Sequence, residues 1–67
     1  MLESNIKIRL AENRMKHQDL SKELNVTKQT LSNWVNGKST PTLETAFKMA
    51  HVLNCKVDDL YIYKEDE

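Results

Sequence analysis

The side chains best suited to chemistry lie in residues 24–43, a stretch without a single acidic residue. Lys28 and Lys38 stand there among amide and hydroxyl side chains, so an anion could dock on this segment. Lys28, Gln29 and Asn33 fall on one face of a predicted helix. In the DNA major groove, amide side chains pair bidentately with adenine, and lysine donates to guanine O6 and N7. A helix of about ten residues is roughly 15 Å long, enough to present such side chains to consecutive base pairs.

The loop that follows this helix offers side chains for phosphate. Lys38, Ser39 and Thr40 are of the kind that positions a protein on the DNA backbone without specifying a sequence. Polar outward faces are also normal on small helical bundles, so ordinary solvated residues are the alternative interpretation of both segments.

Residues outside this stretch offer less chemistry. His51 and Cys55 have the i, i+4 spacing that can hold a metal, but two ligands do not close a zinc site, which needs four. Cys55 has no evident third group to orient a Cys–His nucleophile. The one glycine of the chain cannot form a Gly-rich phosphate loop. We therefore expect no metal, no cofactor and no small-molecule ligand, and we do not expect an enzyme.

Length and composition limit the class of protein that this chain can be. The 67 residues predict a single domain over 1–67, with a core at about 4–61 and an acidic tail at 62–67. Basic and acidic side chains balance, but residues 1–50 carry a net +3 and residues 51–67 a net −3. No apolar run is long enough for a membrane span or a secretory signal, and the lone cysteine fits a reducing compartment. We therefore expect a cytoplasmic protein without a membrane partner.

Short helices are the elements expected to position these side chains. The apolar spacing predicts helices at about 4–14, 17–24, 28–36, 43–53 and 57–61. Ser4, Thr27 and Thr42 are the expected N-caps of the first, third and fourth of these helices. Asn25 and Gly37 suit the left-handed backbone at the ends of the second and third. A β-prone segment at 61–63 could form a short edge strand.

The same spacing predicts which faces are buried. In the third helix Leu31, Trp34 and Val35 should form the inward stripe, which leaves the polar residues outside. In the fourth helix the inward side chains are expected to be Leu43, Ala46, Phe47, Ala50 and Leu53.

A resemblance to a known family is carried by the stretch HQDLSKELNVTKQTLSNWVNGKSTPTLETAFKMAHVLNCKVDDLYIY. It resembles the Xre/Cro-type, phage-repressor-like helix-turn-helix family, and the most specific pieces are LxxxLNVTKQTLSNWxNGKxxPTLET and KMAxxLNCxxDDL. The resemblance extends over residues 6–61. It implies an all-α, compact five-helix, lambda-repressor-like domain with its helix-turn-helix at helices two and three. It also implies sequence-specific binding of double-stranded DNA, usually as a homodimer, and members are mostly bacterial or phage transcription regulators.

The resemblance implies roles for individual residues. Lys28, Gln29 and Asn33 stand where the family reads bases, and Thr30 is a weaker candidate. The positions where the family contacts phosphate are occupied by Thr27, Ser32, Asn36, Lys38 and Ser39.

The start of the second helix departs from the family pattern. The family often has Thr-Gln there to meet a phosphate, whereas this chain has Lys16-His17. His17 could still donate to a phosphate, more strongly when it is protonated, and Gln18 beside it is a further candidate.

The end of the chain holds the candidate dimer contacts. Tyr61, Ile62 and Tyr63 are apolar residues after the last helix, where exposed groups of this kind commonly find a partner chain; alternatively they fold back on their own core. The sequence therefore favours a repressor-like homodimer on an inverted-repeat operator. The alternative is a helical protein-interaction module with incidental DNA binding, because the +3 of residues 1–50 is modest for a DNA-binding domain.

Overall fold

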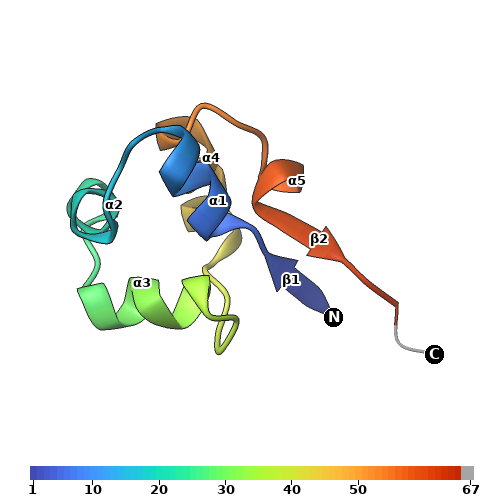
Figure 1. Ribbon diagram of the computed structural model, residues 1–67. Coiled ribbons are helices and arrows are strands. Elements are labelled where there is room, and N and C mark those ends of the chain that lie inside the picture. Colours follow the sequence, from blue (N-terminus) through green and yellow to red (C-terminus); the bar gives the residue numbers. More distant parts are fainter. Residues whose placement is uncertain (66–67) are drawn as a thin grey trace.

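The computed structural model describes residues 1–65, in which helices pack around one another and a two-stranded ribbon extends from them (Figure 1). The elements along the chain are β1 (Leu2–Ser4), α1 (Ile6–Glu12), α2 (His17–Leu24), α3 (Lys28–Val35), α4 (Leu43–Val52), α5 (Val57–Leu60) and β2 (Tyr61–Tyr63). The predicted five-helix, all-α fold with a short C-terminal strand is confirmed. Asp66 and Glu67 of the predicted acidic tail lie outside the described residues.

Two threonines begin α3 and α4 as predicted. The Oγ1 atom of Thr27 accepts a hydrogen bond from Thr30 N at 3.1 Å, and that of Thr42 accepts one from Thr45 N at 3.3 Å. Each cap satisfies a backbone donor that has no partner within the first helical turn. Asn25 ends α2 with a φ of 55°, which confirms the predicted left-handed turn.

One cluster of apolar side chains joins the helices. α2 contacts both α3 and α4, and every helix contributes at least one buried side chain. The largest fully buried side chains are Ile6, Leu20, Leu31, Met49, Leu53 and Leu60. Burial of a side chain of this size stabilises the fold by roughly 1.5–3 kcal/mol, so the cluster fixes how each helix is rotated.

The buried face of α4 is rotated from the predicted one. Ala46 and Ala50 face the core as expected, but Leu43 and Phe47 are 73% and 60% exposed, so their predicted inward placement is wrong. Met49, which the prediction omitted, is fully buried. At about 100° per residue, Leu43 and Phe47 lie on one flank of the buried stripe. The apolar arc of α4 is therefore wider than the surface that the rest of the described chain covers.

The first helix is shorter than predicted at both ends, because a strand precedes it and because it ends at Glu12, before Arg14 adopts a left-handed backbone with a φ of 53°. α1 begins at Ile6 with Asn5 as its N-cap, so the assignment of Ser4 to that position is wrong. Ser4 instead ends β1, and its Oγ accepts from Ile6 N at 3.3 Å. β1 pairs antiparallel with β2, where Ser4 lies opposite Tyr61. The predicted C-terminal strand thus pairs with the other end of the chain.

The burial of Met49 in α4 and the exposure of Ile8 in α1 predict the cost of two substitutions. Met49→Ala should lower the free energy of unfolding by about 2–5 kcal/mol, because it leaves a cavity in a buried site. Ile8→Ala, at a side chain that is 54% exposed, should change it by less than about 0.5 kcal/mol. Urea unfolding followed by circular dichroism at one protein concentration measures both values, and similar losses would contradict the burial of Met49.

Candidate nucleic-acid interface

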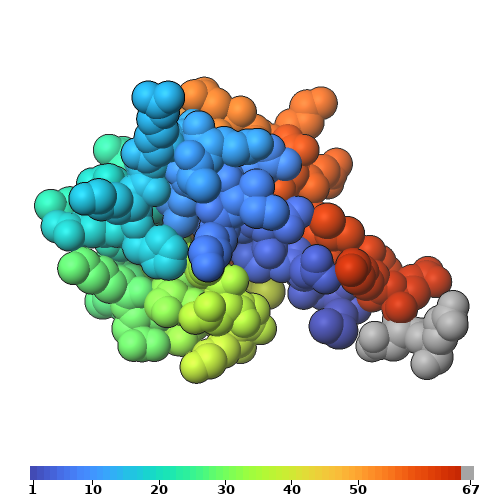
Figure 2. All heavy atoms as spheres, in the orientation of Figure 1, coloured from blue at the N-terminus to red at the C-terminus, as the bar shows by residue number. Residues whose placement is uncertain are grey.

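The rotation of α3 places its polar residues on the outside. Leu31 is fully buried and Trp34 is 7% exposed, as predicted for the inward stripe. Lys28 and Gln29 are exposed, and Asn33 is half-buried. In Figures 1 and 2, α3 (green) runs along one edge of the molecule. α3 therefore presents a polar face of the size that a DNA groove admits.

A tight turn sets the direction of α3 relative to α2. Asn25 N donates to Lys22 O at 3.1 Å, and Val26 N donates to Ser21 O at 3.0 Å. These bonds satisfy carbonyl groups at the end of α2. The buried Ser21 also donates through its Oγ to Gln18 O at 2.9 Å. The two helices thereby form the helix-turn-helix layout.

The N-terminus of α3 carries two linked hydroxyl groups. The Thr27 hydroxyl donates to Thr30 Oγ1 at 2.9 Å while it accepts from the Thr30 backbone N–H. The Thr27 hydroxyl proton is thus engaged within the protein, whereas the Thr30 hydroxyl acts only as an acceptor in this pair. Thr27 is exposed and Thr30 is half-buried.

Two further pairs of side chains lie along α3. Gln29 Nε2 donates to Asn33 Oδ1 at 3.1 Å, and Asn36 Nδ2 donates to Ser32 Oγ at 3.3 Å. Both pairs have the i, i+4 spacing that makes side chains neighbours on a helix. Candidate base-reading and phosphate-contacting groups are therefore held in position by bonds within α3.

Backbone hydrogen bonds anchor the loop after α3 to the helix. Gly37 has the predicted left-handed backbone, with a φ of 76°. Asn33 O accepts from Lys38 N at 2.8 Å and from Ser39 N at 3.4 Å. Lys38, Ser39 and Thr40 are exposed, and Figure 2 shows this segment (yellow-green) beside α3 on the same edge. The candidate phosphate ligands of the loop thus lie next to the candidate base-reading face.

The first turn of α2 combines candidate phosphate ligands with an acidic residue. His17 and Gln18 are exposed. Asp19 Oδ2 accepts from Lys16 N at 3.1 Å and so satisfies a donor at the helix start. This carboxylate occupies the helix end that would otherwise favour an anion. Phosphate contact at this end therefore depends on the His17 and Gln18 side chains.

The structure separates the three predicted dimer residues. Tyr61 packs against the core of its own chain, and burial raises the pKa of its hydroxyl group. Tyr63, opposite Leu2 in the ribbon, is 69% exposed on the same face as Tyr61. Ile62, opposite Glu3, projects from the other face and is 42% exposed. A partner that covers one face of the ribbon would therefore not contact all three side chains.

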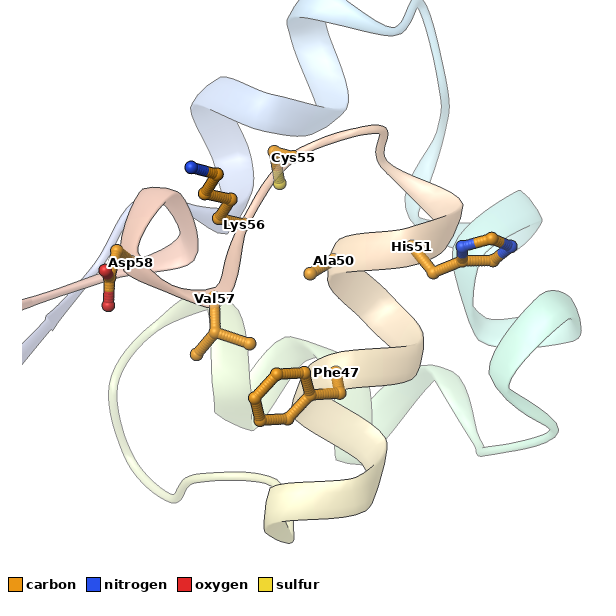
Figure 3. A pocket seen from close by; sticks show the side chains of 7 residues that line it. All are labelled: Phe47, Ala50, His51, Cys55, Lys56, Val57 and Asp58. Atoms are coloured by element: carbon orange, nitrogen blue, oxygen red, sulfur yellow. The ribbon is translucent and has the colours of Figure 1, made fainter.

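Exposed apolar side chains gather where α4, α5 and the ribbon meet. A groove of about 420 Å³ lies between Leu43 and Tyr63, and an adjoining hollow of about 450 Å³ is lined by Phe47 (Figure 3). Val57 and Asp58 line both. We call the following set the apolar surface: Leu2, Pro41, Leu43, Phe47, Val57 and Tyr63.

The hollow in Figure 3 also contains the His51–Cys55 pair. The His51 ring points away from Cys55. Burial and then the Asp59 carboxylate raise the pKa of the Cys55 thiol, which disfavours the thiolate that a nucleophile or metal ligand needs. Within residues 1–65, no group of three or more His, Cys, Asp or Glu side chains is placed to hold a metal ion. No helix in that range is long and apolar enough to cross a bilayer.

Sequence reasoning identified the residues of this face but not the bonds between them. The spacing of Gln29 and Asn33 is a signal that could have revealed their hydrogen bond. The bonds from the loop to Asn33 O carry no such signal, because they depend on the path of the chain after Gly37.

Known proteins share this arrangement. Residues 6–60 match the helix-turn-helix family. An uncharacterized HTH-type transcriptional regulator of Methanocaldococcus jannaschii is 35% identical over 66 residues, which cover 98% of this chain and 100% of the relative. Another, from Archaeoglobus fulgidus, is 36% identical over 53 residues, 79% of this chain and 75% of the relative. A crystal structure of a candidate DNA-binding protein from Bacteroides fragilis has a TM-score of 0.86 and 31% identity, and covers 92% of this chain and 100% of its own.

The matched residues include the whole of α2, the turn and α3, the elements that carry the exposed polar face. Proteins of the matched family are transcription regulators and not enzymes. The chain belongs to the Xre/Cro-like helix-turn-helix family of DNA-binding transcription regulators.

Proposed function

We propose that the protein binds an inverted-repeat operator in double-stranded DNA as a homodimer and regulates transcription from it, with α3 in the major groove. The observation that carries this proposal is the outward placement of Lys28, Gln29 and Asn33 within residues 24–43, which hold no acidic side chain. The major groove is about 12 Å wide and admits a helix, and these side-chain types pair with base edges.

Phosphate contacts on both sides of α3 would set its position in the groove. Lys38, Ser39 and Thr40 follow α3, and His17 and Gln18 begin α2. The formal net charge of the chain is zero, so attraction to DNA has to come from the local distribution of charge. Such contacts fix register and orientation, while α3 supplies the choice of sequence.

The apolar surface supports the homodimer. Leu43 and Phe47 are large side chains left exposed by the described part of the chain, and exposed apolar patches commonly mark protein interfaces. Lys56 and Asp58, of opposite charge, are both exposed and line the hollow beside Phe47. A two-fold interface places each patch against its own copy, so these two charges could pair across the axis. Two copies would present two α3 helices to successive turns of DNA, about 34 Å apart.

Selection from a random duplex library tests the proposed function. The protein should enrich an inverted repeat, and its affinity should fall steeply with salt, by about 0.9 in log–log slope for each phosphate contact. Fluorescence anisotropy at salt concentrations from about 50 to about 300 mM measures the binding. Absence of any enriched sequence, with a flat salt dependence, would favour the protein-interaction module instead.

Two substitutions should separate base reading from phosphate contact. Gln29→Ala should lose about 1–3 kcal/mol of discrimination at one base pair of each half-site, because a bidentate contact is removed. Lys38→Ala should weaken binding to all sequences alike and reduce the salt slope by about 1. Dissociation constants for a set of operator variants measure both effects, and a similar loss of discrimination in the two proteins would contradict the assigned roles.

A charge within the apolar surface should break the dimer. Leu43→Glu should shift the protein to monomers and weaken binding to the full inverted repeat by about tenfold or more, since the second half-site no longer adds avidity. Ile8→Glu is the matched control, because Ile8 is 54% exposed on α1, outside the apolar surface. Sedimentation velocity and anisotropy measure the two effects. A monomeric wild-type protein, or a control that dissociates equally, would refute this interface.

A further inference from the structure

The hydrogen bond between Gln29 and Asn33 joins two candidate base-reading side chains before DNA is bound. Gln29 Nε2 donates to Asn33 Oδ1 at 3.1 Å. Gln29 is exposed in the first turn of α3, whereas Asn33 is half-buried one turn further along. A long, exposed glutamine side chain otherwise samples many rotamers, and ordering it on binding is costly. The bond to Asn33 restricts that freedom in the free protein.

Asn33 is well placed to hold its partner, because its backbone is anchored. Its backbone carbonyl accepts from Lys38 N at 2.8 Å and from Ser39 N at 3.4 Å. Its neighbour Trp34 is buried in the core. Asn33 therefore connects Gln29 to the loop that carries the candidate phosphate ligands.

The donors and acceptors left by this bond are specific. A glutamine amide has two N–H donors and one acceptor oxygen. With one N–H given to Asn33, Gln29 retains Oε1 and a second N–H, the pair of groups that matches N6 and N7 of adenine. Asn33 uses Oδ1 as an acceptor and retains the two N–H donors of Nδ2, which suit guanine O6 and N7 or thymine O4.

We propose that Gln29 and Asn33 read neighbouring base pairs as one unit, in which Asn33 is a positioning residue that holds the Gln29 amide in register with an adenine. This inference rests on the proposed function. It adds that Asn33 determines specificity at the base pair that Gln29 reads. The Asn33 N–H donors read a guanine or thymine beside that adenine.

The test compares adenine preference in variants of Asn33. The base pair read by Gln29 is identified first, as the one at which Gln29→Ala loses discrimination. At that base pair the wild-type protein should prefer adenine by roughly 5- to 150-fold, the range for a bidentate contact. Asn33→Ala should lower this ratio severalfold. Asn33→Asp should keep most of it, because a carboxylate oxygen still accepts from Gln29 Nε2. The negative charge that Asn33→Asp adds weakens binding to every sequence alike. Its effect therefore cancels in the ratio of the affinities for adenine and for the other bases.

A double-mutant cycle and a matched control complete the experiment. Asn33→Ala should have no further effect on the adenine ratio in a Gln29→Ala background, since the two residues act together. Asn36→Ala removes the other side-chain hydrogen bond along α3, from Asn36 Nδ2 to Ser32 Oγ. It should leave the adenine ratio unchanged, while affinity for all sequences falls alike. Circular dichroism melting verifies that each variant is folded.

Each outcome decides the proposal. The proposal is supported if the adenine preference falls in Asn33→Ala and is retained in Asn33→Asp. Independent, additive effects of Gln29→Ala and Asn33→Ala on the adenine ratio overturn the proposal. A preferred base other than adenine at the position read by Gln29 also overturns it. The proposed function stands in both cases. A wild-type protein that enriches no sequence overturns the proposed function itself and the pairing with it.

Discussion

Burial of Leu31 and Trp34 sets the rotation of α3, and the outward polar face that we propose binds DNA depends on that rotation. A shift by one residue would turn the helix by about 100° and move Gln29 or Asn33 toward the core. A buried amide without a partner costs roughly 1–3 kcal/mol, and an exposed tryptophan would forfeit its packing as well. The apolar and polar residues of α3 therefore enforce the same orientation. Stability of the core and the outward presentation of the polar face of α3 are two consequences of one packing arrangement.

The small core also explains why apolar side chains remain on the surface. A domain of this size buries only about 60% of the surface that its unfolded chain exposes. α2 and α5 pack against α4, where Ala46, Met49 and Ala50 are buried, but the flank that carries Leu43 and Phe47 stays exposed. That flank continues into the groove beside Tyr63. Association of two copies would bury this surface and at the same time place two recognition helices on one DNA.

Hydrogen bonds within α3 order side chains that would otherwise be mobile. The hydroxyl pair at its start and the two i, i+4 pairs along its length involve six of its polar or capping residues. The loop that follows is attached through the carbonyl of Asn33. Because less conformational freedom is lost when such a surface binds, more of the contact energy contributes to affinity. The polar face of α3 thus owes its order to local hydrogen bonds and its direction to the core.

The sequence alone determined the features that depend on near neighbours along the chain. The threonine caps of α3 and α4, the left-handed residues Asn25 and Gly37, and the outward face of α3 arise from contacts over three or four residues, which spacing reveals. Only the tertiary structure decided which flank of α4 is covered, and that β1 pairs with β2. It also placed Ile62 on the opposite face of the ribbon from Tyr61 and Tyr63, and left Tyr61 less exposed than the other two. These choices depend on segments distant in sequence, and the apolar spacing of α4 fits either of two overlapping stripes until those segments are in place.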